Sequence, residues 1–291
     1  MLTDAPTSFI YAGALFIMSA VYGPFLKLVL RYYAPTRPKI WLDIFGDSGI
    51  THKTTVMRLV RDILREVLPS QCFLPCDFTQ EGFIEELRTE GGEPIFKYIP
   101  GIIFVDEFGG FLRAVKEKKY LAGLTNFINS LFDEAPFARR LRSGRINVPA
   151  GNYILMMVGL TTPISRYMGI DDFKSGFANR FLHVYGKSER FISSFPTKEE
   201  EIEQLRGEDP RERIFNECVK VVKKRYEWIR NLYEANNHRP LKVLPLDEDV
   251  AETLTRFEER VYEIVNKRLE TNPDDIIAIY STRLFNHLIS I

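Results

Sequence analysis

Apolar residues along the chain follow two alternating patterns, short runs and longer stretches with helical spacing. The short runs predict buried β-strands at about 40–45, 71–75, 101–106, 153–159 and 181–185. The helical stretches predict helices over 53–67, 79–87, 121–131 and 7–32, the last either as one helix or as two broken at Gly23-Pro24. Strands that alternate with helices predict an α/β fold with a right-handed, doubly wound parallel sheet.

The pattern changes after Pro196. Residues 198–213 are rich in charge and predict a surface linker. Two apolar stripes follow, within 215–233 and 250–269, and predict two amphipathic helices that pack in this region. A last helix begins near Asp274 and is still apolar at Ile291. We therefore expect an N-terminal helical segment (1–38), a core (39–195) and a C-terminal helical region (196–291) that continues into a larger architecture.

One stretch near the N-terminus is apolar enough to cross a bilayer. Residues 5–26 carry no charge, and the stretch from Phe9 to Leu30 is long enough for a membrane span. It lacks a basic segment before it, which argues against a secretory signal. Its small residues, such as Ala12, Ala14 and Ala20, favour a helix packed closely inside the protein. We expect a buried helix and no membrane; a membrane anchor with residues 31 onward in the cytoplasm is the alternative.

Composition places the chain among globular proteins. It has 291 residues, of which 45% are hydrophobic, enough for a sizeable core. Basic and acidic residues both number 39, so any contact with nucleic acid must come from a local patch. Three cysteines fit neither a disulfide framework nor a four-ligand zinc site, and the lone histidines have no metal-like spacing. Reduced thiols predict a cytoplasmic location.

The segment between the first predicted core strand and the helix after it has the layout of a phosphate-binding P-loop. Successive backbone N–H groups and the positive end of a helix dipole would form a cradle for an anion. The residues of this loop are Gly46, Asp47, Ser48, Gly49, Ile50, Thr51, His52, Lys53, Thr54 and Thr55.

Two residues of the loop have distinct expected roles, and two features are irregular. Lys53 would reach the outer phosphates, and Thr54 would ligate Mg²⁺. The loop has one position more than the usual motif between the first glycine and the lysine, and His52 stands where the second glycine normally lies. A glycine-containing turn from strand to helix without a ligand is the structural alternative.

A pair of carboxylates follows the strand expected at 101–106. Asp106 and Glu107 close an apolar run, at the end of a buried parallel strand where P-loop ATPases hold the Mg²⁺–phosphate complex. Asp106 would hold the metal through water, and Glu107 would act as general base for the attacking water. The alternative is a core strand that ends in a solvated acidic turn. The order and separation of this pair and the loop at 46–55 favour an ATPase.

With these motifs the chain resembles a P-loop (AAA+/RecA-like) ATPase family of uncharacterised mobile-element proteins, distantly similar to the helicase part of primase-helicases. The resemblance covers nearly the whole chain. It rests on the loop that lacks a second glycine before Lys53, on Val105-Asp-Glu-Phe-Gly-Gly-Phe-Leu112, on Gly159-Leu-Thr-Thr-Pro163 and on Ser175-Gly-Phe-Ala-Asn-Arg-Phe-Leu182. It implies a P-loop NTPase core that uses ATP and Mg²⁺. The extra residue between Gly49 and Lys53 departs from the family pattern.

The resemblance also assigns roles to residues near the ends of the last two core strands. Thr161 and Thr162 match the polar sensor residue that lies between the acidic pair and the γ-phosphate; a plain strand exit is the alternative. Arg180 matches an arginine finger that reaches the γ-phosphate of a neighbouring subunit. A structural salt bridge beside the fifth strand is the alternative for Arg180.

A basic cluster lies between the acidic strand and the sensor strand. By analogy with insertions that point into the pore of ring helicases, it predicts a hairpin that contacts a nucleic-acid backbone. A solvated loop or a subunit contact would have the same composition. The cluster consists of Arg139, Arg140, Arg142 and Arg145.

Taken together, the sequence predicts an Mg²⁺-dependent ATPase that forms a ring or another homo-oligomer and acts on DNA during replication of a mobile element or virus. Two other classes remain open. One is a scaffold or switch that binds ATP to control assembly with a partner and hydrolyses little of it, which the irregular loop permits. The other is an ATPase tethered to a membrane by its N-terminal helix.

Overall fold

The computed structural model describes most of the chain. The described residues are 4–29, 36–76, 80–87, 93–117, 123–141, 144–187, 198, 209–243 and 248–281.

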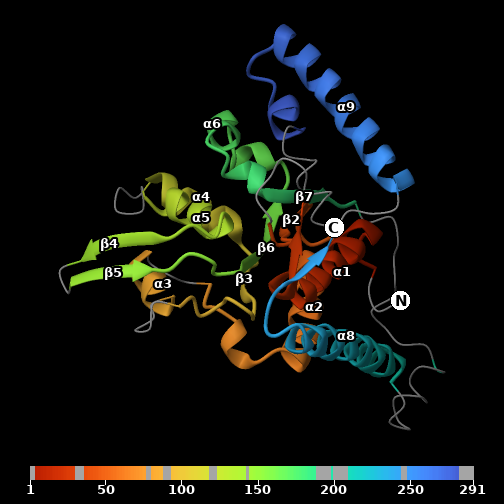
Figure 1. The fold of residues 1–291 in the computed structure, drawn as a ribbon. Helices are drawn as coiled ribbons and strands as arrows, with labels where there is room; N and C mark the ends of the chain where they lie inside the picture. The colour runs from red at the N-terminus through yellow and green to blue at the C-terminus, as the bar shows by residue number, and fades with distance from the viewer. Residues whose placement is uncertain are drawn as a thin grey trace.

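A four-stranded parallel sheet forms the centre of the fold (Figure 1). Its strands are β3 (Gly101–Val105), β6 (Ile154–Thr161), β2 (Trp41–Gly46) and β7 (Phe181–Tyr185), in that spatial order. The register pairs Gly101 with Ile154 on one side of β6 and Leu42 with Met157 on the other. Seven of the eight residues of β6 are buried, which fits a central strand with apolar side chains on both faces.

Helices cover both faces of this sheet (Figure 1). One face carries α1 (Thr7–Tyr22), α2 (Lys53–Val67) and, beyond them, α8 (Pro210–Ala235). The other carries α4 (Phe108–Glu117) and α5 (Leu124–Phe132). Shorter elements are α3 (Gln80–Glu86), α6 (Ile170–Lys174), η1 (Gly23–Phe25), η2 (Ser70–Cys72), η4 (Ile164–Arg166) and η5 (Ala178–Arg180). The expectation of an α/β fold built on a parallel sheet is therefore confirmed.

The apolar N-terminal helix packs inside this fold. The segment Thr7–Phe25 is long and apolar enough to cross a membrane, but 56% of it is buried in the protein. Phe9 and Phe16 have no exposed surface. Gly13 lies so close to α2 that a Cβ at this position would be 2.8 Å from Val60 Cγ2. This packing is that of a core helix, as the small residues of the segment predict.

Two predicted elements differ in the structure, and a third is described only in part. Residues 26–28 do not continue the first helix but form β1 (Leu26–Leu28), because Gly23 and Pro24 end the helix. Residues 71–75 contribute η2 and a single bridge from Phe73 to Ile102 instead of a strand, since Pro69 and Pro75 flank the segment. The last helix is described only as far as residue 281.

The two helices of the C-terminal region form as predicted but do not pack together. Tyr226, Ile229 and Tyr233 of α8 are buried, and Phe25 contacts the rings of Tyr226 and Tyr233. By contrast α9 (Glu248–Thr271) lies at the opposite end of the molecule from α8 (Figure 1). The strand β8 (Leu241–Val243) separates them, and it pairs in parallel with β1. The two helices predicted for this region are therefore present, and they lie apart from each other.

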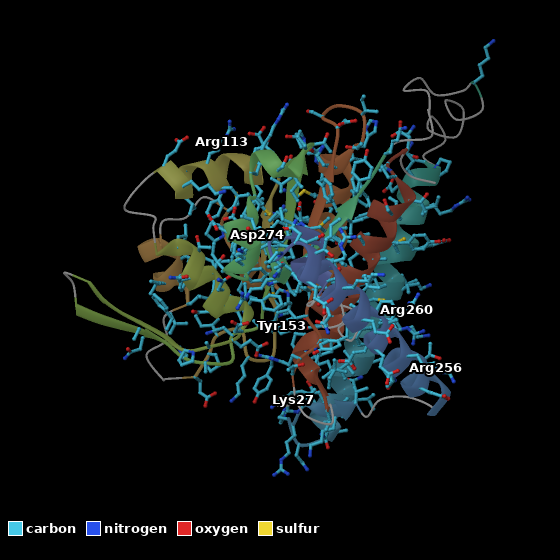
Figure 2. All side chains as sticks on the ribbon, turned by 90° about the horizontal axis from the view of Figure 1, so that it is seen from above. Lys27, Arg113, Tyr153, Arg256, Arg260 and Asp274 are labelled. Atoms are coloured by element: carbon cyan, nitrogen blue, oxygen red, sulfur yellow. The ribbon has the colours of Figure 1, made fainter. Side chains whose placement is uncertain are left out.

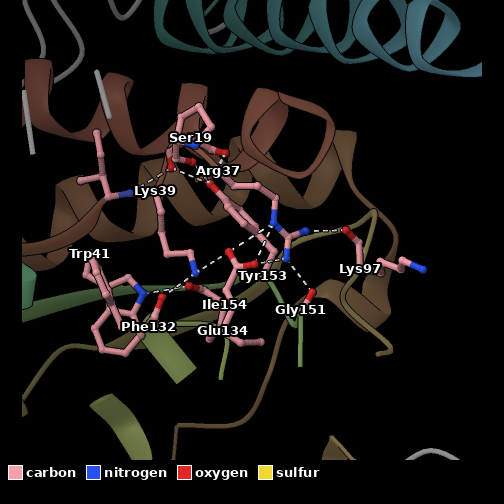
Figure 3. A network of polar contacts seen from close by, with 12 residues as sticks. Ser19, Arg37, Lys39, Trp41, Lys97, Phe132, Glu134, Gly151, Tyr153 and Ile154 are labelled. Carbon is pink, nitrogen blue, oxygen red and sulfur yellow. Dashed lines mark hydrogen bonds and ion pairs between the residues drawn. The ribbon is translucent and has the colours of Figure 1, made fainter. Parts of the chain in front are cut away.

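A buried ionic cluster joins the segments that lead into β2, β3 and β6 (Figure 3). The carboxylate of Glu134 accepts hydrogen bonds from Arg37, at 2.9 Å from Nε, and forms an ion pair of 2.8 Å with Lys39. Arg37 also donates to the carbonyl oxygens of Lys97 and Gly151, at 2.6 and 2.5 Å. Burial opposes ionisation of Glu134, but the neighbouring Lys39 and Arg37 outweigh it and hold the pKa of Glu134 below its ordinary value.

We predict that Glu134→Gln lowers the free energy of unfolding by about 3 kcal/mol, because two buried cations lose their counterion. Urea denaturation measures this change. Glu93→Gln is a matched control, since Glu93 is 74% exposed and its ion pair with Lys97 lies at the surface; this change should cost less than about 0.5 kcal/mol. Equal effects of the two substitutions would contradict the role given to the cluster.

The same variant has a distinctive pH dependence. A carboxyl group whose pKa is lowered in the folded state contributes stability that is complete above the ordinary glutamate pKa. That contribution disappears as the pH falls through the lowered pKa of the folded protein. The difference in stability between the wild type and Glu134→Gln should therefore shrink in acid.

Candidate functional site

The loop between β2 and α2 closes on itself through a short internal hydrogen bond. Thr51 is buried, and its Oγ1 donates to the carbonyl oxygen of Asp47 at 2.9 Å. Gly49 and His52 have positive φ angles, 78° and 49°. Two left-handed residues let the chain turn twice within the loop, which accommodates the extra position before Lys53. His52 stands where the usual motif has glycine and takes a backbone conformation that glycine favours.

Neighbouring segments confine both ends of this loop. A Cβ at Gly46 would lie 2.6 Å from the carbonyl oxygen of Gly186 and 2.8 Å from Thr51 Cγ2, so no larger residue fits. At the other end, His52 Nε2 lies 3.2 Å from Asp4 Oδ1, which brings the N-terminal segment to the start of α2. Gly49, at the loop tip, has open space around it.

Lys53 is the first residue of α2, and its amine turns back into the loop. Its Nζ donates to the carbonyl oxygen of Gly46 at 2.8 Å and lies 3.3 Å from Thr51 Oγ1. Burial lowers the pKa of Lys53, and the carboxylates of Asp106, Asp47 and Asp43 oppose this shift. A cation therefore sits at the N-terminal end of α2, where the helix dipole already favours an anion.

Thr54 and Asp106 are in direct contact. Thr54 Oγ1 donates to the Asp106 carboxylate at 2.8 and 3.0 Å from its two oxygens. The two residues are 52 positions apart in the sequence, on the first turn of α2 and just beyond β3. Both supply oxygen ligands, which Mg²⁺ prefers. The structure thus brings together the two residues that the sequence assigned to the metal.

The two threonines at the end of β6, Thr161 within it and Thr162 just beyond it, lie at the same edge of the sheet but have different partners. Thr162 Oγ1 donates to Asp47 Oδ1 in the loop. Thr161 Oγ1 is 2.6 Å from the hydroxyl of Tyr167. Because β6 lies between β2 and β3, these residues stand between the loop and the acidic pair. Tyr167 is therefore a further residue of this site, and it was not identified from the sequence.

Glu107 lies next to the predicted metal ligands. It follows Asp106 directly, stands just before α4 and has an exposed side chain. Phe108, the next residue, is buried and fixes the start of the helix against Phe177 and Phe181. The carboxylate of Glu107 is therefore held near Asp106 while remaining accessible to solvent.

Arg180 is engaged within the chain. Its Nη2 donates to Asp133 Oδ2 at 2.5 Å, and its Nη1 donates to the carbonyl oxygen of Gly176 at 2.7 Å. The guanidinium lies over the ring of Phe132, and the residue is only 8% exposed. This is the structural salt bridge that the sequence left open as the alternative to a finger. A role in a neighbouring subunit would require this ion pair to open.

The arginine cluster lies on a projecting β-hairpin (Figure 1). The strands β4 (Phe137–Leu141) and β5 (Gly144–Val148) pair in antiparallel register, with Arg139 opposite Ile146 and Arg140 opposite Arg145. The hairpin predicted for this segment is present, while Arg142 falls outside the described residues. Its base is anchored by the buried cluster, because Gly151 donates from its backbone nitrogen to the carbonyl oxygen of Glu134.

A second polar pair, missed from the sequence, lies beneath the loop. Asp43 is fully buried in β2, and its Oδ2 lies 2.7 Å from His183 Nδ1 in β7. The other ring nitrogen is 2.9 Å from the carbonyl oxygen of Ala178. Burial raises the pKa of Asp43, and His183 opposes this shift. An aspartate inside the apolar run Trp41–Phe45 was the available signal, since buried carboxylates require a partner.

The residues at the edge of the sheet fit a nucleotide with Mg²⁺. The described part of the chain holds no group of three or more His, Cys, Asp and Glu side chains that would bind a metal by themselves. A P-loop site needs none, because phosphate oxygens and water complete the coordination of Mg²⁺ around one or two protein ligands. Thr54 and Asp106 supply that set, and Lys53 supplies the charge for phosphate.

Comparison with known proteins adds no further assignment. No protein-family model matches the chain, and a search of curated proteins finds no match.

We predict that Gly46→Ala destabilises the protein by about 2 kcal/mol, because the added methyl group meets the carbonyl oxygen of Gly186 and the side chain of Thr51. Gly110→Ala is the control, since a Cβ at this helical position meets nothing within 4 Å and alanine favours the helix. Thermal unfolding measures both variants. Similar melting temperatures would show that the loop is not confined as described.

Proposed function

We propose that the chain binds ATP with Mg²⁺ at the loop 46–55 and hydrolyses it. The hydrogen bond from Thr54 to Asp106 carries this proposal. It joins the end of the loop to the acidic strand, at one edge of a parallel sheet, with the lysine beside it. Ligands of open α/β sheets bind at the carboxyl ends of the strands, which is where these residues lie.

In this proposal, different residues of the loop and the sheet contact the phosphates and the metal. The backbone of the loop and the N-terminal end of α2 face the phosphates, and Lys53 exchanges its contact with Gly46 for one with the outer phosphates. Thr54 and Asp106 would hold the metal. Bound Mg²⁺ neutralises charge on the phosphate oxygens and orients them for in-line attack.

Glu107 and Thr162 serve the hydrolytic step in this proposal. Glu107 is exposed beside Asp106 and accepts a proton from the attacking water. Thr162 bridges from β6 to Asp47. A phosphate that enters the loop would compete for this hydroxyl, which gives Thr162 a means to distinguish the occupied loop from the empty one. The resemblance to mobile-element ATPases supports the same roles.

One observation favours a second candidate, a nucleotide-gated switch that hydrolyses little ATP. Arg180, which the resemblance assigns to a neighbouring active site, is held by Asp133 and stacked on Phe132. Without an arginine supplied in trans, P-loop proteins hydrolyse slowly. In that case the protein would act through the change of contacts at Thr162 and Lys53 when ATP binds, and not through ATP hydrolysis.

The assignment of Glu107 as general base predicts that Glu107→Gln reduces ATP turnover by about 100-fold or more while nucleotide affinity is retained. Lys53→Ala should instead weaken ATP binding by about tenfold or more, since a charged contact to phosphate is lost. Steady-state turnover and calorimetric titration with ATP and Mg²⁺ measure the two effects. Glu117→Gln, at the far end of α4, should change neither.

Two results would contradict this proposal. Turnover that survives Glu107→Gln would remove the general base. ATP affinity that is unchanged in Lys53→Ala would place the nucleotide elsewhere. A wild type that binds ATP but does not hydrolyse it would favour the nucleotide-gated switch.

The hairpin supports a further part of the proposal, that the ATPase acts on DNA. Arginines on a projecting hairpin favour contact with phosphates. Replacing Arg139, Arg140, Arg142 and Arg145 by alanine should weaken DNA binding to a similar degree for all sequences, and it should lower the salt dependence of that binding by about one unit per lost contact. Replacing Arg256 and Arg260 on α9 by alanine is the matched control, and it should leave DNA binding unchanged. ATP turnover that is the same with and without DNA in the wild type would contradict this part.

A further inference from the structure

One side of α8 carries an apolar seam that no part of the described chain covers. Val221, Trp228 and Leu232 are 59%, 52% and 38% exposed, although α8 buries a different face on α1 and α2. Their spacing belongs to a longer series with alternating steps of four and three residues, the repeat of a coiled-coil seam. The series, here called the outer seam of α8, is Ile214, Cys218, Val221, Arg225, Trp228, Leu232 and Ala235.

A matching seam runs along α9. Phe257 and Ile264 are 38% and 49% exposed, and Val261 between them is only partly buried. Among the described side chains of α9, only Val265 is buried. The sequence extends the same alternation of steps from Val250 to Thr271. We call this series the α9 seam; its members are Val250, Leu254, Phe257, Val261, Ile264, Arg268 and Thr271.

The two seams are held apart within one chain. The segment that follows α8 is fixed by the pairing of β8 with β1. Beyond α9, Asp274 pairs with Lys174, and the hydroxyl of Tyr280 donates to the carbonyl oxygen of Phe181 in β7. Figure 1 shows α9 on the far side of the sheet from α8, and in Figure 2 Arg256 and Arg260 of α9 reach outward. Pairing within the chain would break these anchors.

The charges of the two helices are complementary. α8 contains seven basic and four acidic residues, a net charge of +3, and α9 contains four basic and seven acidic residues, a net charge of −3. Exposed lysines gather beside the outer seam at Lys220, Lys223 and Lys224. Pairing of α9 with another α9, or of α8 with another α8, would bring like charges together. Charges that flank a seam select the partner in this way.

From these observations we propose that the α9 seam of one copy docks against the outer seam of α8 in a second copy. The helices are 26 and 24 residues long, or roughly 35 to 40 Å, so their seams can pair over about three heptads. The contact covers the apolar residues that the fold leaves exposed and places opposite charges side by side. The proposal does not rest on nucleotide binding.

Mixing two variants tests this contact. The first replaces Val221, Trp228 and Leu232 by serine, and the second replaces Phe257 and Ile264 by serine. Sedimentation velocity should show a wild type that self-associates and variants that are each monomeric. An equimolar mixture of the variants should form a heterodimer, because each contributes the seam that the other lacks. Tyr262→Ser is the control, since this tyrosine is 68% exposed on α9 but lies off the seam.

Each alternative gives a different and contrary result. A wild type that is monomeric at all concentrations overturns the proposal. Association of the first variant alone would indicate pairing between two α9 helices, and association of the second alone would indicate pairing between two α8 helices. A mixture that stays monomeric, although circular dichroism shows both variants folded, also overturns it.

Trp228 provides an independent measurement. It is exposed, while the second tryptophan, Trp41, is fully buried in the core. Association should shift the fluorescence of the wild type to shorter wavelength as concentration rises, because Trp228 leaves water. The Phe257 and Ile264 double variant keeps both tryptophans and should show no shift. A concentration-independent spectrum in the wild type would contradict the docking of α8.

Discussion

The parallel pairing of β6 with β2 on one side and with β3 on the other is the constraint on which the site depends. It places the carboxyl ends of three strands at one edge of the sheet, although these ends lie far apart in sequence. Thr54 then reaches Asp106, and Thr162 reaches Asp47. None of these contacts would survive a slip in register, because a shift of one residue turns every side chain of a strand to the other face. The buried apolar side chains of β6 make such a slip costly.

Buried charges hold the elements around this sheet. Glu134 binds Arg37 and Lys39 at the start of β2, and Asp133, the preceding residue, binds Arg180 at the start of β7. Asp43 and His183 join the same two strands again below the loop. A charge in this environment is costly without its partner, so each pair fixes a distance between segments instead of adding much stability. The hairpin with the arginine cluster begins just after Glu134 in the chain. The contacts of Glu134 therefore attach the hairpin to the core.

Much of the sheet and part of the site could be predicted from the sequence. Short apolar runs identified β2, β3, β6 and β7, and the loop with Asp106 identified residues that the structure brings into contact. Spatial order could not be predicted, because local periodicity does not record which strands are neighbours. The partners of Arg180 and Asp43 were missed for the same reason. For α8 and α9, the apolar stripe in the sequence predicts that one face of each helix is buried. It does not predict which part of the protein buries that face.

The central claim is that Thr54 and Asp106 act together as the protein's share of a magnesium–nucleotide site. A double-mutant cycle of Thr54→Ala and Asp106→Ala on ATP affinity, measured with and without Mg²⁺, tests it most directly. We expect the coupling between the two substitutions to be larger with Mg²⁺ than without it, by about 1 kcal/mol or more, because the metal adds to the direct hydrogen bond that already joins the two residues. Additive losses under both conditions, or ATP affinity that is independent of Mg²⁺ in the wild type, would contradict the account.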